Sequence, residues 1–141
     1  MKRRVVLVVF IFSLGLLSGC GGDRENPTVT TDADRAMESY LTNVEKMGKL
    51  LADTQSESEA KAVTPQILMI VQDMRDLVPK MKAITDEQQA ETISKYRVKS
   101  QKVNEQFAKD IVHFVEIPGA SENLIRQLKN LPPVFGLGDG S

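Results

Sequence analysis

Apolar residues recur every three or four positions along most of the chain, and this spacing constrains the fold more than any other feature. Such spacing gathers apolar side chains on one face of an α-helix. No stretch of five or more residues alternates between apolar and polar residues between turn signals, so the sequence predicts helices and no sheet. The strongest stripe is formed by Val63, Ile67, Ile70, Val71, Met74, Leu77, Val78, Met81 and Ile84.

Capping residues divide this pattern into separate helices. A first helix is expected to begin at Asp32 or Asp34, because an aspartate side chain can accept hydrogen bonds from the N–H groups of the first turn. The second helix has two alternative starts. Either Thr64 is its N-cap with Pro65 at the first helical position, or the helix begins near Ser58 and Pro65 kinks it.

A third helix is marked by Thr85 and Gln88, which have the spacing of a capping box, and it continues to the break at Pro118-Gly119. Its middle section, KYRVKSQKVNEQ, is strongly polar, so we expect it either to extend past the core or to face water on most sides. A short fourth helix follows the break. Because short connections favour antiparallel neighbours, residues 34–131 are predicted to form a small all-α antiparallel bundle of three long helices plus a short fourth.

The first 19 residues have the three-part order of a secretory signal peptide. Three basic residues at positions 2–4 are followed by a mostly apolar run at 5–17 and by the small residues Ser18 and Gly19. The apolar run is short of the roughly 20 residues that a helix needs to cross a bilayer. We therefore expect residues 1–19 to be removed.

The only cysteine of the chain, Cys20, lies directly after this segment. The four residues Leu17-Ser18-Gly19-Cys20 resemble the lipobox of bacterial lipoproteins, whose pattern is leucine, a small polar or aliphatic residue, glycine or alanine, then cysteine. The resemblance implies that the Cys20 thiol receives a diacylglyceryl group. It also implies that a peptidase cuts between Gly19 and Cys20 and that the new amino group is acylated.

Several acyl chains on Cys20 would hold a folded domain on a membrane without a spanning helix. Each buried methylene contributes about 0.8 kcal/mol, and a single chain anchors only marginally. The alternative is that Cys20 is a small buried side chain. A disulfide within the chain is excluded, because the sequence contains one cysteine.

The residues after Cys20 bear on location and reach. In well-studied Gram-negative lipoproteins, an aspartate directly after the cysteine tends to retain the protein on the inner membrane. This chain has Gly21 at that position. By resemblance, the glycine favours the outer membrane, facing the periplasm. Residues 20–33 show no apolar period and are predicted to be a flexible tether. Such a tether reaches roughly 45–50 Å when fully extended. Residues 132–141 are predicted to be a flexible tail.

Composition argues against several classes of function. Residues 20–141 carry 15 basic and 19 acidic side chains, so no basic stripe remains to bind nucleic acid. The single histidine, His113, has no recognisable nucleophile motif nearby, and we expect it to be structural and the chain not to be an enzyme. Methionine and histidine can ligate haem iron, but methionines at helical spacing are more often core residues. No cofactor is therefore predicted.

These features predict a membrane-anchored, periplasm-facing lipoprotein whose bundle is a protein-interaction or envelope-assembly module. Its partners would be the membrane, through lipidated Cys20, and another envelope protein or the cell wall. A bundle of three long helices and one short one leaves a groove, which apolar residues near the C-terminus could fill or present to a partner. These residues are Leu124, Leu128, Leu131 and Phe135. The alternatives are a bundle that binds haem, metal or lipid, and a structural surface protein without a specific partner.

Overall fold

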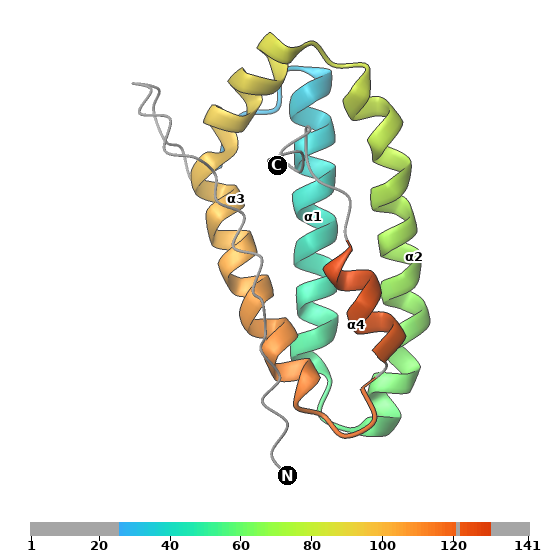
Figure 1. Ribbon diagram of the computed structural model, residues 1–141. Helices are drawn as coiled ribbons and strands as arrows, with labels where there is room; N and C mark the ends of the chain where they lie inside the picture. The colour runs from blue at the N-terminus through green and yellow to red at the C-terminus, as the bar shows by residue number, and fades with distance from the viewer. Residues whose placement is uncertain (1–25, 121, 131–141) are drawn as a thin grey trace, which may run out of the picture.

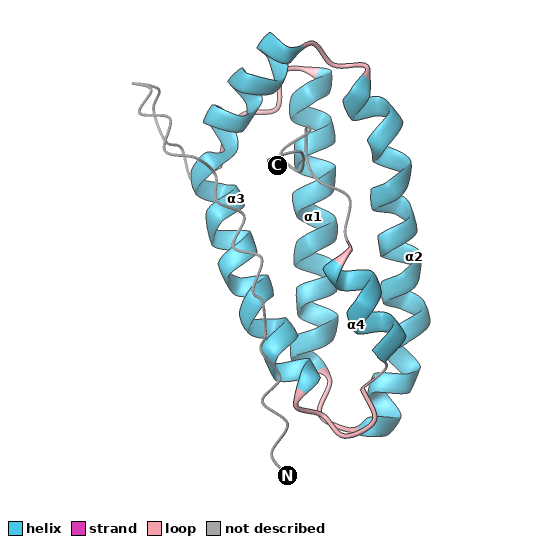
Figure 2. Cartoon of the chain, viewed as in Figure 1, coloured by secondary structure: helices cyan, strands magenta, loops and turns pink. Residues whose placement is uncertain are grey.

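The computed structural model describes residues 26–120 and 122–130, and over these ranges the chain is helical, with turns and no strand. Its helices are α1 (Asp32–Asp53), α2 (Glu57–Lys82), α3 (Asp86–Val115) and α4 (Glu122–Lys129). Helix α1 lies between α2 and α3; it runs antiparallel to α2 and parallel to α3, while the short α4 packs against α2 (Figure 1). The predicted bundle of three long helices plus a short fourth is confirmed (Figure 2).

Helix α1 begins with a complete capping box. The Thr31 hydroxyl accepts a hydrogen bond from the Asp34 N–H at 3.1 Å, and the Asp34 carboxylate accepts one from the Thr31 N–H at 3.2 Å. The N-cap is therefore Thr31, and the prediction of Asp32 or Asp34 as the cap is wrong. The reciprocal bonds satisfy two N–H groups that no carbonyl within the helix can reach.

Helix α2 uses the upstream of the two predicted starts. Its N-cap is Ser56, whose hydroxyl accepts from the Glu59 N–H at 3.3 Å, so the start at Thr64 is wrong. Thr64 instead lies inside the helix and donates its hydroxyl hydrogen to the Ala60 carbonyl at 2.7 Å. Pro65 is exposed, so water can hydrate the carbonyl that its missing N–H leaves without a helical partner.

Helix α3 begins at the predicted cap, because the Thr85 hydroxyl accepts from the Gln88 N–H at 3.4 Å. After α3, the chain turns at Gly119, whose φ of +80° lies in the left-handed region that glycine adopts without strain. A Cβ atom at this position would come within 2.6 Å of Glu57 Cγ. The glycine thus lets the turn between α3 and α4 pack closely against the first turn of α2.

The core is built mainly from the apolar stripes of α1 and α2. Helix α3 contributes fewer buried apolar side chains than either, namely Tyr96, Val103 and Phe114. Methionine and aliphatic residues dominate, as the low aromatic content requires. The fully buried side chains of α1 and α2 include Leu41, Met47, Leu51, Ile67 and Met74.

The described end of the predicted tether is packed rather than free. Pro27 is buried, and Thr30 and Thr31 are hydrogen-bonded to the first turn of α1. None of the four described helices combines the length and the apolar character that crossing a bilayer requires.

Candidate functional site

Helix α3 docks on α1 through a row of polar side chains, which we call the polar seam. It consists of Asp34 and Glu38 on α1 and Thr92, Lys95 and Lys99 on α3. These residues lie three, four or seven positions apart on their own helices, so on each helix they share one face. The polar seam therefore explains how α3 packs against α1, although its polar middle section was expected to extend past the core or face water on most sides.

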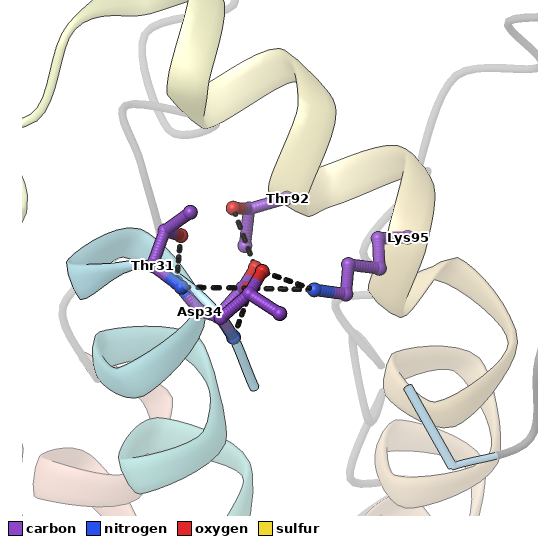
Figure 3. Close-up of polar contacts among 5 residues, drawn as sticks. Thr31, Asp34, Thr92 and Lys95 are labelled. Atoms are coloured by element: carbon purple, nitrogen blue, oxygen red, sulfur yellow. Dashed lines mark hydrogen bonds and ion pairs between the residues drawn. The ribbon is translucent and has the colours of Figure 1, made fainter. Parts of the chain in front are cut away.

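Asp34 is the centre of the seam and is only 2% exposed. Its Oδ2 atom accepts hydrogen bonds from the Thr30 N–H and hydroxyl, both at 2.9 Å, and from the Lys95 ammonium at 2.5 Å. Its Oδ1 atom accepts from the Thr92 hydroxyl at 3.1 Å. Figure 3 shows the carboxylate between the first turn of α1 and the two side chains from α3. A single carboxylate thus joins the incoming chain, α1 and α3.

The hydrogen bonds determine how Asp34 ionises. Burial alone would raise its pKa, but the bonds from Lys95, Thr30 and Thr92 outweigh burial and hold the pKa well below its ordinary range. The charged carboxylate is therefore the form that the fold stabilises.

One turn further along α1, Glu38 pairs with Lys99. Both side chains are partly exposed, so water screens the pair and its net contribution is about 1 kcal/mol or less. Tyr96, also on α3, is fully buried, and its Oη atom has no hydrogen-bond partner among the described residues. Burial, helped by the charges of Glu38 and Asp34 and by the closeness of the Glu38 carboxylate to the hydroxyl, raises the pKa of Tyr96 to about 12, so the hydroxyl stays protonated.

Removing the Tyr96 hydroxyl should not cost stability. A buried hydroxyl without a partner carries a desolvation penalty, so Tyr96→Phe is expected to raise the free energy of unfolding by up to about 1 kcal/mol. The measurement is urea unfolding followed by circular dichroism. Tyr96→Leu is the control, since loss of the ring should lower stability by about 2 kcal/mol or more. A Tyr96→Phe variant that is less stable than the parent would indicate that the hydroxyl has a partner, either the Glu38 carboxylate or a water molecule.

The far half of the α1–α3 interface is also polar. The Asp110 carboxylate lies over Gly48, where a Cβ atom would approach Asp110 Oδ2 within 2.6 Å, and it accepts a bond from Gln106 Nε2 at 2.8 Å. His113 Nε2 lies 2.9 Å from the Thr54 carbonyl oxygen, to which it donates. His113 therefore ties the last turn of α3 to the residue after α1, which supports the structural role expected from the sequence.

The residues predicted as an interaction surface are divided. Leu124 and Leu128 are buried in the core, and α4 is held to α2 by a hydrogen bond from Arg75 to Gln127. These two leucines thus fill the bundle, the first of the two alternatives, and are not exposed to a partner. The other two, Leu131 and Phe135, lie outside the described residues.

The residues of the predicted processing site, Gly19 and Cys20, also lie outside the described residues. Of the methionines considered as ligands, Met69 is exposed and the others are core residues, namely Met37, Met47, Met74 and Met81. Across residues 26–120 and 122–130, no group of three or more histidine, cysteine or acidic side chains is arranged to hold a metal ion.

Comparison of the chain with protein-family models, curated proteins and solved structures finds no match. The site must therefore be interpreted from its own residues. Sequence reasoning missed the polar seam, although two signals were present. Thr31 and Asp34 have the spacing of a capping box, and the α3 residues Thr92, Lys95 and Lys99 recur at helical spacing.

Proposed function

We propose that the chain is a lipoprotein, anchored through acylated Cys20, whose helical bundle binds another envelope protein or the cell wall. The observation that carries the proposal is the order of residues 1–20: a basic start, an apolar run and Leu17-Ser18-Gly19-Cys20. Gly21 after the cysteine supports an outer-membrane location facing the periplasm. The proposed role is non-enzymatic.

The arrangement of the helices supports a module presented from one end. The described part of the chain begins at Asn26 and enters α1 at the end of the bundle that also holds the turn between α2 and α3 (Figure 1). The turn between α1 and α2 and the turn between α3 and α4 lie at the opposite end. An anchor at Cys20 would therefore leave that far end directed away from the membrane.

The buried polar groups support a binding role over a catalytic one. Asp34, Thr92 and Asp110 are buried polar side chains, and each is hydrogen-bonded within the bundle. His113 is bonded to a backbone carbonyl. These groups hold helices together: the Thr92 hydroxyl, which donates to Asp34, is buried between α1 and α3 and is not open to a substrate.

Mass spectrometry of the chain extracted from its host's membranes tests the anchor. The wild-type chain should begin at Cys20 and carry acyl groups, whereas Cys20→Ala should keep residues 1–19. Ser18→Ala is the matched control, because alanine fits the small position of the lipobox and processing should continue. An unmodified cysteine with residues 1–19 still attached would contradict the proposal. A partner that crosslinks only to the lipidated form would support the interaction role.

A further inference from the structure

We propose that Asp34 and Lys95 clasp residues 27–31 to the bundle and so set how far the bundle can stand from its anchor. We call Thr30, Asp34 and Lys95 the tether clasp. The inference rests on the proposed function, because the tether has meaning only if Cys20 is attached to a membrane. Its structural half can be tested without that assumption.

The clasp is more than the cap of a helix. A capping box needs only the reciprocal bonds between Thr31 and Asp34. Here the Asp34 carboxylate also holds Thr30 through its N–H and its hydroxyl. Lys95 reaches across from α3 to the same carboxylate and donates to Thr30 Oγ1 at 3.2 Å. Residues before the helix are thus bonded to α3 as well as to α1.

Burial along the incoming chain agrees with this view. Pro27 is buried although it precedes α1 by several residues, and Lys95 is only about a quarter exposed at its side chain (26%). Asp34 is only 2% exposed, so its carboxylate is largely closed to water, whereas Thr30 and the tip of Lys95 remain open to solvent. The segment is therefore packed at Pro27 and held by hydrogen bonds at Thr30, which is itself exposed.

The clasp changes the length of chain available to the anchor. From Cys20 to Pro27 there are about seven peptide units, which span at most about 25 Å. If residues 27–31 were released, the free chain would run to Asp32 and span at most about 40 Å. Opening the clasp would thus let the bundle stand roughly 15 Å further from the membrane. The flexible tether predicted from the sequence, residues 20–33, corresponds to the state in which residues 27–31 are released from the bundle.

Hydrogen exchange of the full chain in detergent, resolved by residue with NMR, tests the clasp. The Thr30 and Thr31 amides should exchange at least about ten-fold more slowly than unstructured peptide amides. Asp34→Ala should remove this protection and Lys95→Met should reduce it several-fold, while the amides of Leu41 and Val44 stay protected in both. Lys61→Met is the matched control, because Lys61 forms an exposed ion pair with Glu57 on α2. It should leave Thr30 and Thr31 unchanged.

The outcomes separate the clasp from the anchor. Rapid exchange of Thr30 and Thr31 in the wild-type chain would overturn the clasp, as would protection that Lys95→Met and Asp34→Ala leave intact. Mass spectrometry of the same sample shows whether Cys20 is acylated. Protected amides on a chain with an unmodified Cys20 would overturn the tether-length inference together with the proposed function, and would leave only the structural contact.

Discussion

Replacing Asp34 with alanine is expected to lower the free energy of unfolding by about 2–4 kcal/mol. The substitution removes the half of the capping box in which the Asp34 carboxylate accepts from the Thr31 N–H, and it removes the acceptor for Lys95 and Thr92. A lost cap costs about 1 kcal/mol, and hydrogen bonds to a charged group contribute about 1.5–3 kcal/mol. The loss stays within this range because Lys95 is partly exposed and can regain water. Urea unfolding monitored by circular dichroism measures the change.

Asp32→Ala is the matched control for this variant. Asp32 has the same side chain two positions earlier, but that side chain is 86% exposed and pairs only with Arg35 one turn along the helix. Such a surface pair contributes about 0.5 kcal/mol or less. Similar losses for Asp32→Ala and Asp34→Ala would contradict the central position of Asp34 in the polar seam.

Acid should remove the advantage of Asp34 over alanine. The folded state lowers the pKa of Asp34 below its ordinary value of 3.8, so its contribution to stability is full above that value. The contribution is lost as the pH falls below 3.8 towards the folded-state pKa, because the unfolded chain takes up the proton first. The difference in stability between wild type and Asp34→Ala should thus be constant from pH 7 to about 5 and shrink below pH 4.

The helices could be predicted from the sequence because their signals are local. The apolar period from Val63 to Ile84 identified α2, and Thr85 identified the start of α3. The start of α2 was left open because Pro65 fits the first position of a helix and also, as a kink, the interior of a longer one. An interior proline is tolerated where it is exposed to water, as Pro65 is. Whether Pro65 is exposed depends on which face of α2 packs against α1.

The polar seam could not be predicted in the same way. The sequence shows that Lys95 and Lys99 share a face of α3, but a lysine face is more often turned to water than to another helix. Their partners, Asp34 and Glu38, lie about 60 residues away. Pairing across that distance depends on the register and rotation of α3 against α1. Register is fixed jointly by buried Tyr96, by Val103, and by Asp110 over Gly48.

Replacing Met74 with alanine is expected to lower the free energy of unfolding by about 2–4 kcal/mol, because it opens a cavity in the core. Met69, one and a half turns earlier on the same helix, offers a matched control. Met74 is 0% exposed and Met69 is 71% exposed, so Met69→Ala should change stability by less than about 0.5 kcal/mol. Urea unfolding of the two variants under identical conditions makes the comparison.

The same pair distinguishes a core methionine from a ligand. If Met74 held a haem or a metal ion, the purified wild-type chain would carry that group and Met74→Ala would reduce its content. If Met74 only packs, the substitution costs stability and leaves the composition of the purified chain unchanged. Equal effects of Met69→Ala and Met74→Ala on stability would contradict the packing of α2 against α1. A large difference between the two variants, with no bound group in either, would support a packing role for Met74 in the core.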